Sequence, residues 1–323
     1  MQQERQASPF AHLSGQQRAK KLLGRSLASG RIAHAYLFRG PDGVGKKLFG
    51  AAMAKALNCR VDGPSGACGS CLSCRKFDSG NHPDFEVESP EKKAIKIERV
   101  RQLCKSLSYP PYESERRVVV IEDVHTMRAE AANSLLKTLE EPPPGNVLIL
   151  TGETSKNILA TISSRCQIVP FFPLTVEETA EILQKKENLH REQSQLLARL
   201  AEGSPGQALL LHKTDMIETW KKVTSILSEP KYKNDRYIYT VLQLAGQMAD
   251  LKENLLPMFG LLRVWLRDIL VEKTGVMSCS GVSPFLPQSI FAKLEAIDRA
   301  EQELARNCNR SLVCEILLFR LQC

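Results

Sequence analysis

Hydrophobic positions in the first half of the chain form two kinds of run, one continuous and one with helical spacing. The continuous runs are rich in β-branched and aromatic residues: HAYLFRG (34–40), RRVVVIEDVH (116–125) and NVLILTGE (146–153). Strands that are apolar on both faces suit the centre of a parallel sheet. The runs with helical spacing lie around them: 15–29, KKLFGAAMAKALNC (46–59) and MRAEAANSLLKTLEE (127–141). Alternating strands and helices predict an α/β domain with a parallel sheet and flanking helices.

The second half of the chain has no strand signal after about residue 173. Thr175 precedes Glu178 by three residues, a capping box that opens a helix. SQLLARLAEGSPGQALLL (194–211) indicates two helices around a Gly/Pro turn, and helical periodicity continues from about residue 214. We therefore expect an α/β domain over 1–173, a small helical domain over 174–213 and a helical bundle over 214–323.

Composition narrows the class of protein without fixing it. The 323 residues include 44 basic and 36 acidic side chains, and a net charge of +8 permits a nucleic-acid-facing surface without requiring one. No run of 18 apolar residues occurs, and the N-terminal stretch lacks the apolar core of a signal peptide. We expect a cytoplasmic protein with no membrane contact. Four of the ten cysteines are clustered, and in a reducing cytosol a cluster points to metal rather than disulfides, whereas the six scattered ones are expected to be small buried or surface residues.

A phosphate-binding loop is predicted after the first strand. Gly40 is followed, after four residues that include Gly43, by Gly45 and Lys46, and a helix begins there. Such a loop cradles phosphates with backbone N–H groups, and the next side chain holds Mg²⁺ through a hydroxyl. Here that side chain is Lys47, whose ammonium only donates hydrogen bonds and repels a cation.

The acidic partner of this loop is also unusual. In a site of this kind a later buried strand usually ends in Asp-Glu, where Asp assists Mg²⁺ and Glu positions water. Here VVVIED ends in Glu122-Asp123, the inverted order. Errors of about 1 Å in position can cost on the order of 100-fold in rate. We predict a degenerate site that does not hydrolyse ATP, and leave open binding of ATP without hydrolysis.

Four cysteines predict a structural zinc site within an insertion over 59–79. The spacing is Cys59-x8-Cys68-x2-Cys71-x2-Cys74, in a Gly/Ser-rich stretch without regular period. Four thiolates close a tetrahedral zinc site and leave no position for water. An iron–sulfur cluster is the alternative, although the first interval is long for it. His82 is surplus to four ligands, and we expect it in solvent.

Several motifs together resemble one family. HAYLFRGPDGVGKK, the cysteine spacing, LLKTLEEPPPGNVLILTGE and TISSRCQIVPF are similar to delta-prime subunits of the bacterial DNA polymerase III clamp loader, within the AAA+ ATPase superfamily. The resemblance is most specific over residues 10–175. It implies an AAA+ domain with a zinc-binding insertion, a helical lid and a C-terminal collar for oligomerisation.

The resemblance also assigns roles to individual residues. Arg165, in Ser164-Arg165-Cys166, matches the arginine finger that enters the ATP site of a neighbouring subunit, and the four cysteines match zinc ligands. Lys46 matches the phosphate-loop lysine. Gln207 stands where motor subunits carry a second sensing arginine, and the first sensing residue lies near Thr151.

The implied function is an ATPase-deficient end piece of the clamp loader that completes a neighbour's catalytic centre. The implied partners are gamma/tau motor subunits, a delta subunit, the sliding clamp and primer–template DNA. We expect no ATPase or polymerase activity from the chain alone. Two alternatives stay open: a gamma/tau-like motor with its own ATP hydrolysis, and a zinc-dependent nucleic-acid binder using Arg75, Lys76 and Phe77.

Overall fold

The computed structural model describes residues 9–61, 66–91, 94–153, 158–214, 216–228, 235–273 and 287–322. The chain separates into two compact units. The first comprises Met1–Ala198 with Glu202–Gln207, and the second comprises Arg199–Ala201 with Ala208–Cys323. The proposed three-domain boundaries remain a prediction.

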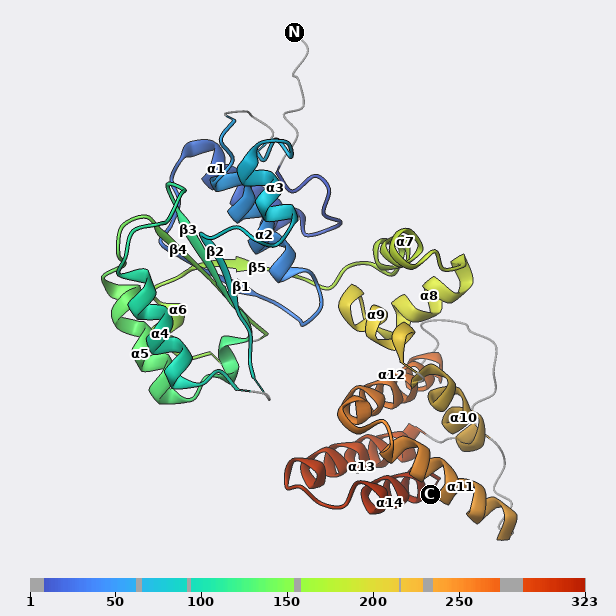
Figure 1. Ribbon diagram of the computed structural model, residues 1–323. Helices are drawn as coiled ribbons and strands as arrows, with labels where there is room; N and C mark the ends of the chain where they lie inside the picture. The colour runs from blue at the N-terminus through green and yellow to red at the C-terminus, as the bar shows by residue number, and fades with distance from the viewer. Residues whose placement is uncertain are drawn as a thin grey trace. The chain divides into compact units, whose positions relative to one another are not determined.

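The first unit contains a five-stranded parallel sheet, as the continuous hydrophobic runs predicted. Its strand order is β2-β3-β4-β1-β5 (Figure 1). The strands are β1 (Ala35–Arg39), β2 (Phe85–Glu88), β3 (Arg117–Ile121), β4 (Asn146–Gly152) and β5 (Gln167–Pro170). The three central strands are buried along nearly their whole length, whereas the edge strand β2 is mostly half-buried. Because these strands are parallel, the carboxyl ends of β1, β3 and β4 lie at the same edge of the sheet.

Helices cover both faces of this sheet (Figure 1). The helices of the first unit are α1 (Gln17–Ser29), α2 (Lys46–Leu57), α3 (Leu72–Asp78), α4 (Ile97–Leu107), α5 (Ala129–Glu140), α6 (Ala160–Ser163) and α7 (Val176–Glu187). One core cluster joins α1 and α2 to the sheet and includes Phe10 and Phe49, and a second joins α4, α5 and α6 and includes Leu135 and Ile162. Thr175 and Glu178 form the predicted capping box at the start of α7.

The described part of the insertion contains a helix that the sequence pattern did not show. The stretch has no regular hydrophobic period, yet α3 lies within it, and Cys71 caps this helix by accepting a hydrogen bond from the backbone N–H of Cys74. The solvent position expected for His82 is also wrong. Only 4% of His82 is exposed, because its ring stacks on Phe77 at 4.1 Å and its Nε2 lies 3.1 Å from Ser73 Oγ.

A buried carboxylate fastens the loop that leads into β3. Asp84 is fully buried, and its two oxygens accept hydrogen bonds from the backbone N–H groups of Tyr112, Glu113 and Ser114. The three donors are therefore satisfied without any secondary structure in their own segment. The side chain of Asp84, the residue just before β2, therefore fastens this loop through three hydrogen bonds.

The described part of the second unit is helical, as the sequence predicted. Its helices are α10 (Met216–Ser228), α11 (Asp235–Ala249), the 3₁₀ turn η3 (Lys252–Asn254), α12 (Leu255–Lys273), α13 (Pro287–Ala305) and α14 (Arg310–Gln322). Two further helices, α8 (Arg191–Leu200) and α9 (Pro205–Lys213), carry the chain between the units. Arg263 of α12 pairs with Asp298 at 2.6 Å and Glu301 at 3.1 Å on α13. None of the described helices is long and apolar enough to cross a membrane.

Candidate functional site

The predicted phosphate loop lies between β1 and α2. Gly40 follows β1 and donates its N–H to Gly152 O of β4 at 3.1 Å, and Gly45 is the N-cap of α2. Gly43 and Gly45 have φ angles of 73° and 98°, which L side chains rarely adopt. The strand, loop and helix that this motif requires are all present.

Lys46 is turned back onto its own loop. Its Nζ donates to Gly40 O at 2.9 Å and to Pro41 O at 2.6 Å, and the residue is only 5% exposed. Burial lowers the pKa of Lys46, although four nearby carboxylates, that of Asp42 first among them, oppose the shift. Two main-chain carbonyls thus hold the ammonium that would otherwise reach phosphate.

Lys47 makes an ion pair with the first acidic residue of the predicted pair. Its Nζ lies 2.9 Å from Glu122 Oε2, which also accepts a hydrogen bond from Ser89 Oγ. The Lys47 side chain is 52% exposed and that of Glu122 is 21% exposed. The structure therefore brings together the two sequence departures, a cation in place of a hydroxyl and Glu in place of Asp.

Asp123, two residues after the end of β3, has a left-handed backbone with φ 50°. Its N–H donates to Oγ1 of buried Thr151 at 3.1 Å, so the suggested first sensing residue contacts the acidic pair. Burial is the main cause that raises the pKa of Asp123, and Asp42 adds to it.

Gly206, near the start of α9, contacts the phosphate loop directly. Gly206 N donates to Gly43 O at 2.9 Å, and Ser204 Oγ donates to Asp42 O at 2.8 Å. A Cβ on Gly206 would lie 2.6 Å from Gly43 Cα. Gln207 N is also close, since a Cβ on Gly43 would lie 3.1 Å from it. The role predicted for Gln207 stays a prediction. Sequence reasoning did not identify the Gly206 contact, for which the Pro-Gly pair in EGSPGQ was the available signal.

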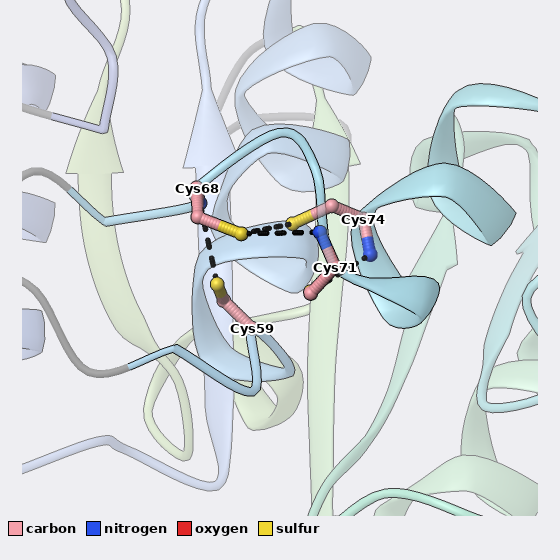
Figure 2. Close-up of side chains that lie close together, drawn as sticks. All are labelled: Cys59, Cys68, Cys71 and Cys74. Carbon is pink, nitrogen blue, oxygen red and sulfur yellow. Dashed lines mark hydrogen bonds between the residues drawn. The ribbon is translucent and has the colours of Figure 1, made fainter.

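The four predicted metal ligands come together in the insertion (Figure 2). Their sulfur atoms all lie within 4.8 Å of one another, and Cys68 Sγ and Cys74 Sγ are 4.0 Å apart. Tetrahedral zinc with bonds of about 2.3 Å needs sulfur–sulfur separations of about 3.8 Å. The cluster could therefore hold zinc with small adjustments, and its purely thiol donor set suits that ion.

Backbone N–H groups also point at these sulfurs. Cys68 N donates to Cys59 Sγ at 3.2 Å, and Cys71 N donates to Cys68 Sγ at 3.3 Å. The hydrogen bonds from Cys71 and Ser70 lower the pKa of Cys68 to about 6, whereas burial raises that of Cys74 to about 12. The cluster thus carries thiolate character at its exposed end.

Arg165 lies just after α6. Its Nη1 donates to Thr161 O at 2.9 Å and to Ser164 Oγ at 3.2 Å. Its Nη2 lies 2.5 Å from Oε1 of Glu140, the last residue of α5, and the Arg165 side chain is 34% exposed. Sequence reasoning did not identify Glu140, which lies 25 positions earlier in the chain.

Comparison with known proteins identifies the family to which this chain belongs. A family model described as DNA polymerase III, delta subunit, matches residues 15–175. The DNA polymerase III subunit gamma of Buchnera aphidicola from Acyrthosiphon pisum is 32% identical over 96% of this chain and 89% of its own length. The chain belongs to the family of DNA polymerase III clamp-loader subunits.

Other clamp-loader subunits agree with this assignment. The delta-prime subunit of Bacillus subtilis is 34% identical over 65% of this chain and 64% of its own length. The chain spans less than two thirds of the length of several delta-prime and tau relatives that it matches. A gamma subunit-related protein of Thermotoga maritima shares the fold, with a TM-score of 0.52 and 19% identity over 94% of this chain and 98% of that one.

Proposed function

We propose that this chain is the delta-prime subunit of the clamp loader, an end piece that does not hydrolyse ATP and that donates Arg165 to a neighbouring motor subunit. The observation that carries this proposal is the Lys47–Glu122 ion pair at 2.9 Å. In a working site a hydroxyl and a carboxylate at these positions share one Mg²⁺. Here the ammonium of Lys47 neutralises the carboxylate, so the metal loses one ligand and meets a cation.

Lys46 and Gly206 support the same proposal. The Lys46 ammonium is satisfied by Gly40 O and Pro41 O, and reaching a phosphate requires breaking both hydrogen bonds. The segment that carries a second sensing arginine in motor subunits has no charged side chain at Gly206 or Gln207. Both features reduce the positive charge at the place where the γ-phosphate would lie.

Arg165 has the properties that a donated finger needs. Its guanidinium is permanently charged, and its planar fork of donors matches a γ-phosphate whose charge develops during hydrolysis. The side chain is partly exposed, at 34%, and its backbone follows the buried Ile162 of α6. The neighbour would be a gamma/tau subunit, in an assembly with delta that opens the sliding clamp on primed DNA.

The test is the ATPase rate of the reconstituted loader with clamp and primed DNA present. Arg165→Ala is expected to lower turnover sharply, by about 10³-fold at one site if the finger contributes as in other nucleotide hydrolases. Lys46→Ala is expected to leave it near wild type, as is Arg101→Ala, an exposed-arginine control on α4. Unchanged turnover in Arg165→Ala refutes the finger.

The second candidate is a gamma-like motor, which the near full-length similarity to the Buchnera gamma subunit favours. In that case Lys46→Ala is the damaging change. ATP hydrolysis by the isolated chain, abolished by the same substitution, would establish this alternative.

A further inference from the structure

Glu140 and Arg165 form an ion pair between the ends of two helices. Nη2 of the arginine lies 2.5 Å from Glu140 Oε1, and Nη1 bonds back to Thr161 O, four residues earlier. The guanidinium is therefore folded onto its own chain. Both of its terminal nitrogens already have acceptors before any partner approaches.

The backbone on each side of the pair is fixed. Leu139 precedes Glu140 and is 1% exposed, and Ile162, whose carbonyl accepts from Arg165 N at 3.1 Å, is also 1% exposed. Both side chains belong to the same core cluster. Glu140 ends α5, where the helix dipole adds partial negative charge and further favours a cation. The fold thus holds the two backbones where these side chains can reach each other.

We propose that Glu140 parks the finger, holding Arg165 in a retracted and charge-neutralised position until the γ-phosphate of a neighbour's nucleotide displaces the carboxylate. The inference rests on the proposed role of Arg165 as a finger. It assigns to Glu140 a positioning role, since this side chain acts on the nucleotide only through the arginine.

Competition between two anions is the physical basis. A guanidinium bonded to Glu140 brings that carboxylate close to any phosphate it meets, and the two anions repel. The arginine must therefore exchange one partner for the other. Because the Glu140 side chain is 49% exposed, solvent weakens the pair. Exposed pairs of this kind favour the paired over the unpaired state by only about two- to fivefold. This is strong enough to bias the resting state and weak enough to be displaced.

The functional experiment compares Glu140→Gln with Glu141→Gln in the reconstituted loader. Glu141 is the adjacent exposed residue, so the two variants lose the same charge one position apart. Glu140→Gln is expected to raise the ATPase rate measured without clamp and DNA by about two- to fivefold. Glu141→Gln is expected to match wild type, and Glu140→Asp, which keeps the charge, to fall between them.

Arg165→Ala is measured alongside, so that two failures can be told apart. If it lowers turnover while Glu140→Gln matches or falls below wild type, the parking role is wrong and the finger stands. If it has no effect, the finger is wrong and the parking role falls with it.

The structural experiment needs no hydrolysis. In the free chain labelled with ¹⁵N-arginine, hindered rotation of the Arg165 guanidinium should give split Nη signals in wild type and in Glu141→Gln. Glu140→Gln should merge them, and identical spectra for both variants overturn the inference. Arg165→Ala assigns the signals.

Discussion

Replacing Lys47 by threonine restores the hydroxyl that a phosphate loop uses to hold Mg²⁺. The substitution removes an ammonium 2.9 Å from Glu122 Oε2 and frees that carboxylate. Two unit charges 4 Å apart interact by about 4 kcal/mol at an effective dielectric constant of 20, so Mg²⁺ and an ammonium would repel by about 8 kcal/mol. Lys47 is half exposed and can move away, which lowers the realised repulsion.

A tenfold change in affinity requires only about 1.4 kcal/mol. We therefore expect Lys47→Thr to bind ATP at least about tenfold more tightly with Mg²⁺ than the wild-type chain does. Without Mg²⁺ the variant should bind no more tightly than wild type, because it has lost a cation beside the phosphates. Loss of the exposed ion pair alone should change the free energy of unfolding by at most about 1 kcal/mol, so thermal unfolding without nucleotide controls for folding.

The assay is titration with a fluorescent ATP analogue, with Mg²⁺ and with EDTA. Wild-type binding that Mg²⁺ strengthens tenfold or more would show that the metal tolerates Lys47. An unchanged Mg²⁺ effect in Lys47→Thr would show that the ion pair does not control this site. Either result refutes the reasoning that Lys47 excludes the metal.

Three further predictions concern stability and metal. Gly206→Ala should lower the free energy of unfolding by about 1–3 kcal/mol, because its Cβ meets loop backbone; Gly24→Ala, which meets nothing within 4 Å on α1, should not lower the melting temperature. A thiol-modifying reagent should release one zinc per wild-type chain, measured with a chromogenic chelator. Cys68→Ser should abolish this release, whereas Cys308→Ser, at an exposed cysteine outside the cluster, should retain it. Burial lowers the pKa of His82, so the folded chain takes up this proton less readily. Stability should therefore fall as pH drops through the unfolded value of about 6.5, and this loss should shrink in His82→Gln, as measured by thermal melts between pH 7.5 and 5.5.

The sheet and the site were predictable to different degrees. The run 117–121 is continuously hydrophobic and rich in β-branched residues, and the structure forms the predicted buried strand there. The edge strand β2 escaped prediction because FEVE alternates apolar and acidic residues over only four positions. A short, half-polar strand is specified by its neighbour β3, which is not visible from local pattern.

Local motifs located the site residues, but side-chain contacts that the sequence pattern does not show decided their states. The loop sequence predicted where Lys46 lies, yet not that two carbonyls hold it. Glu140 and Arg165 are far apart in the chain, and only packing of α5 beside α6 brings them together. The expected solvent position of His82 was wrong because the ring of Phe77, five positions earlier, stacks on it, and the sequence around His82 carries no burial signal.

The buried carboxylate of Asp84 has a consequence for hydrogen exchange. The amide protons of Tyr112, Glu113 and Ser114 lie in an irregular loop, where fast exchange with solvent is usual. All three donate to one carboxylate that is fully buried. Their release requires opening of the sheet edge at β2 rather than local fraying. These loop amides should exchange on the timescale of the β-sheet, as a protected patch in a segment without regular structure.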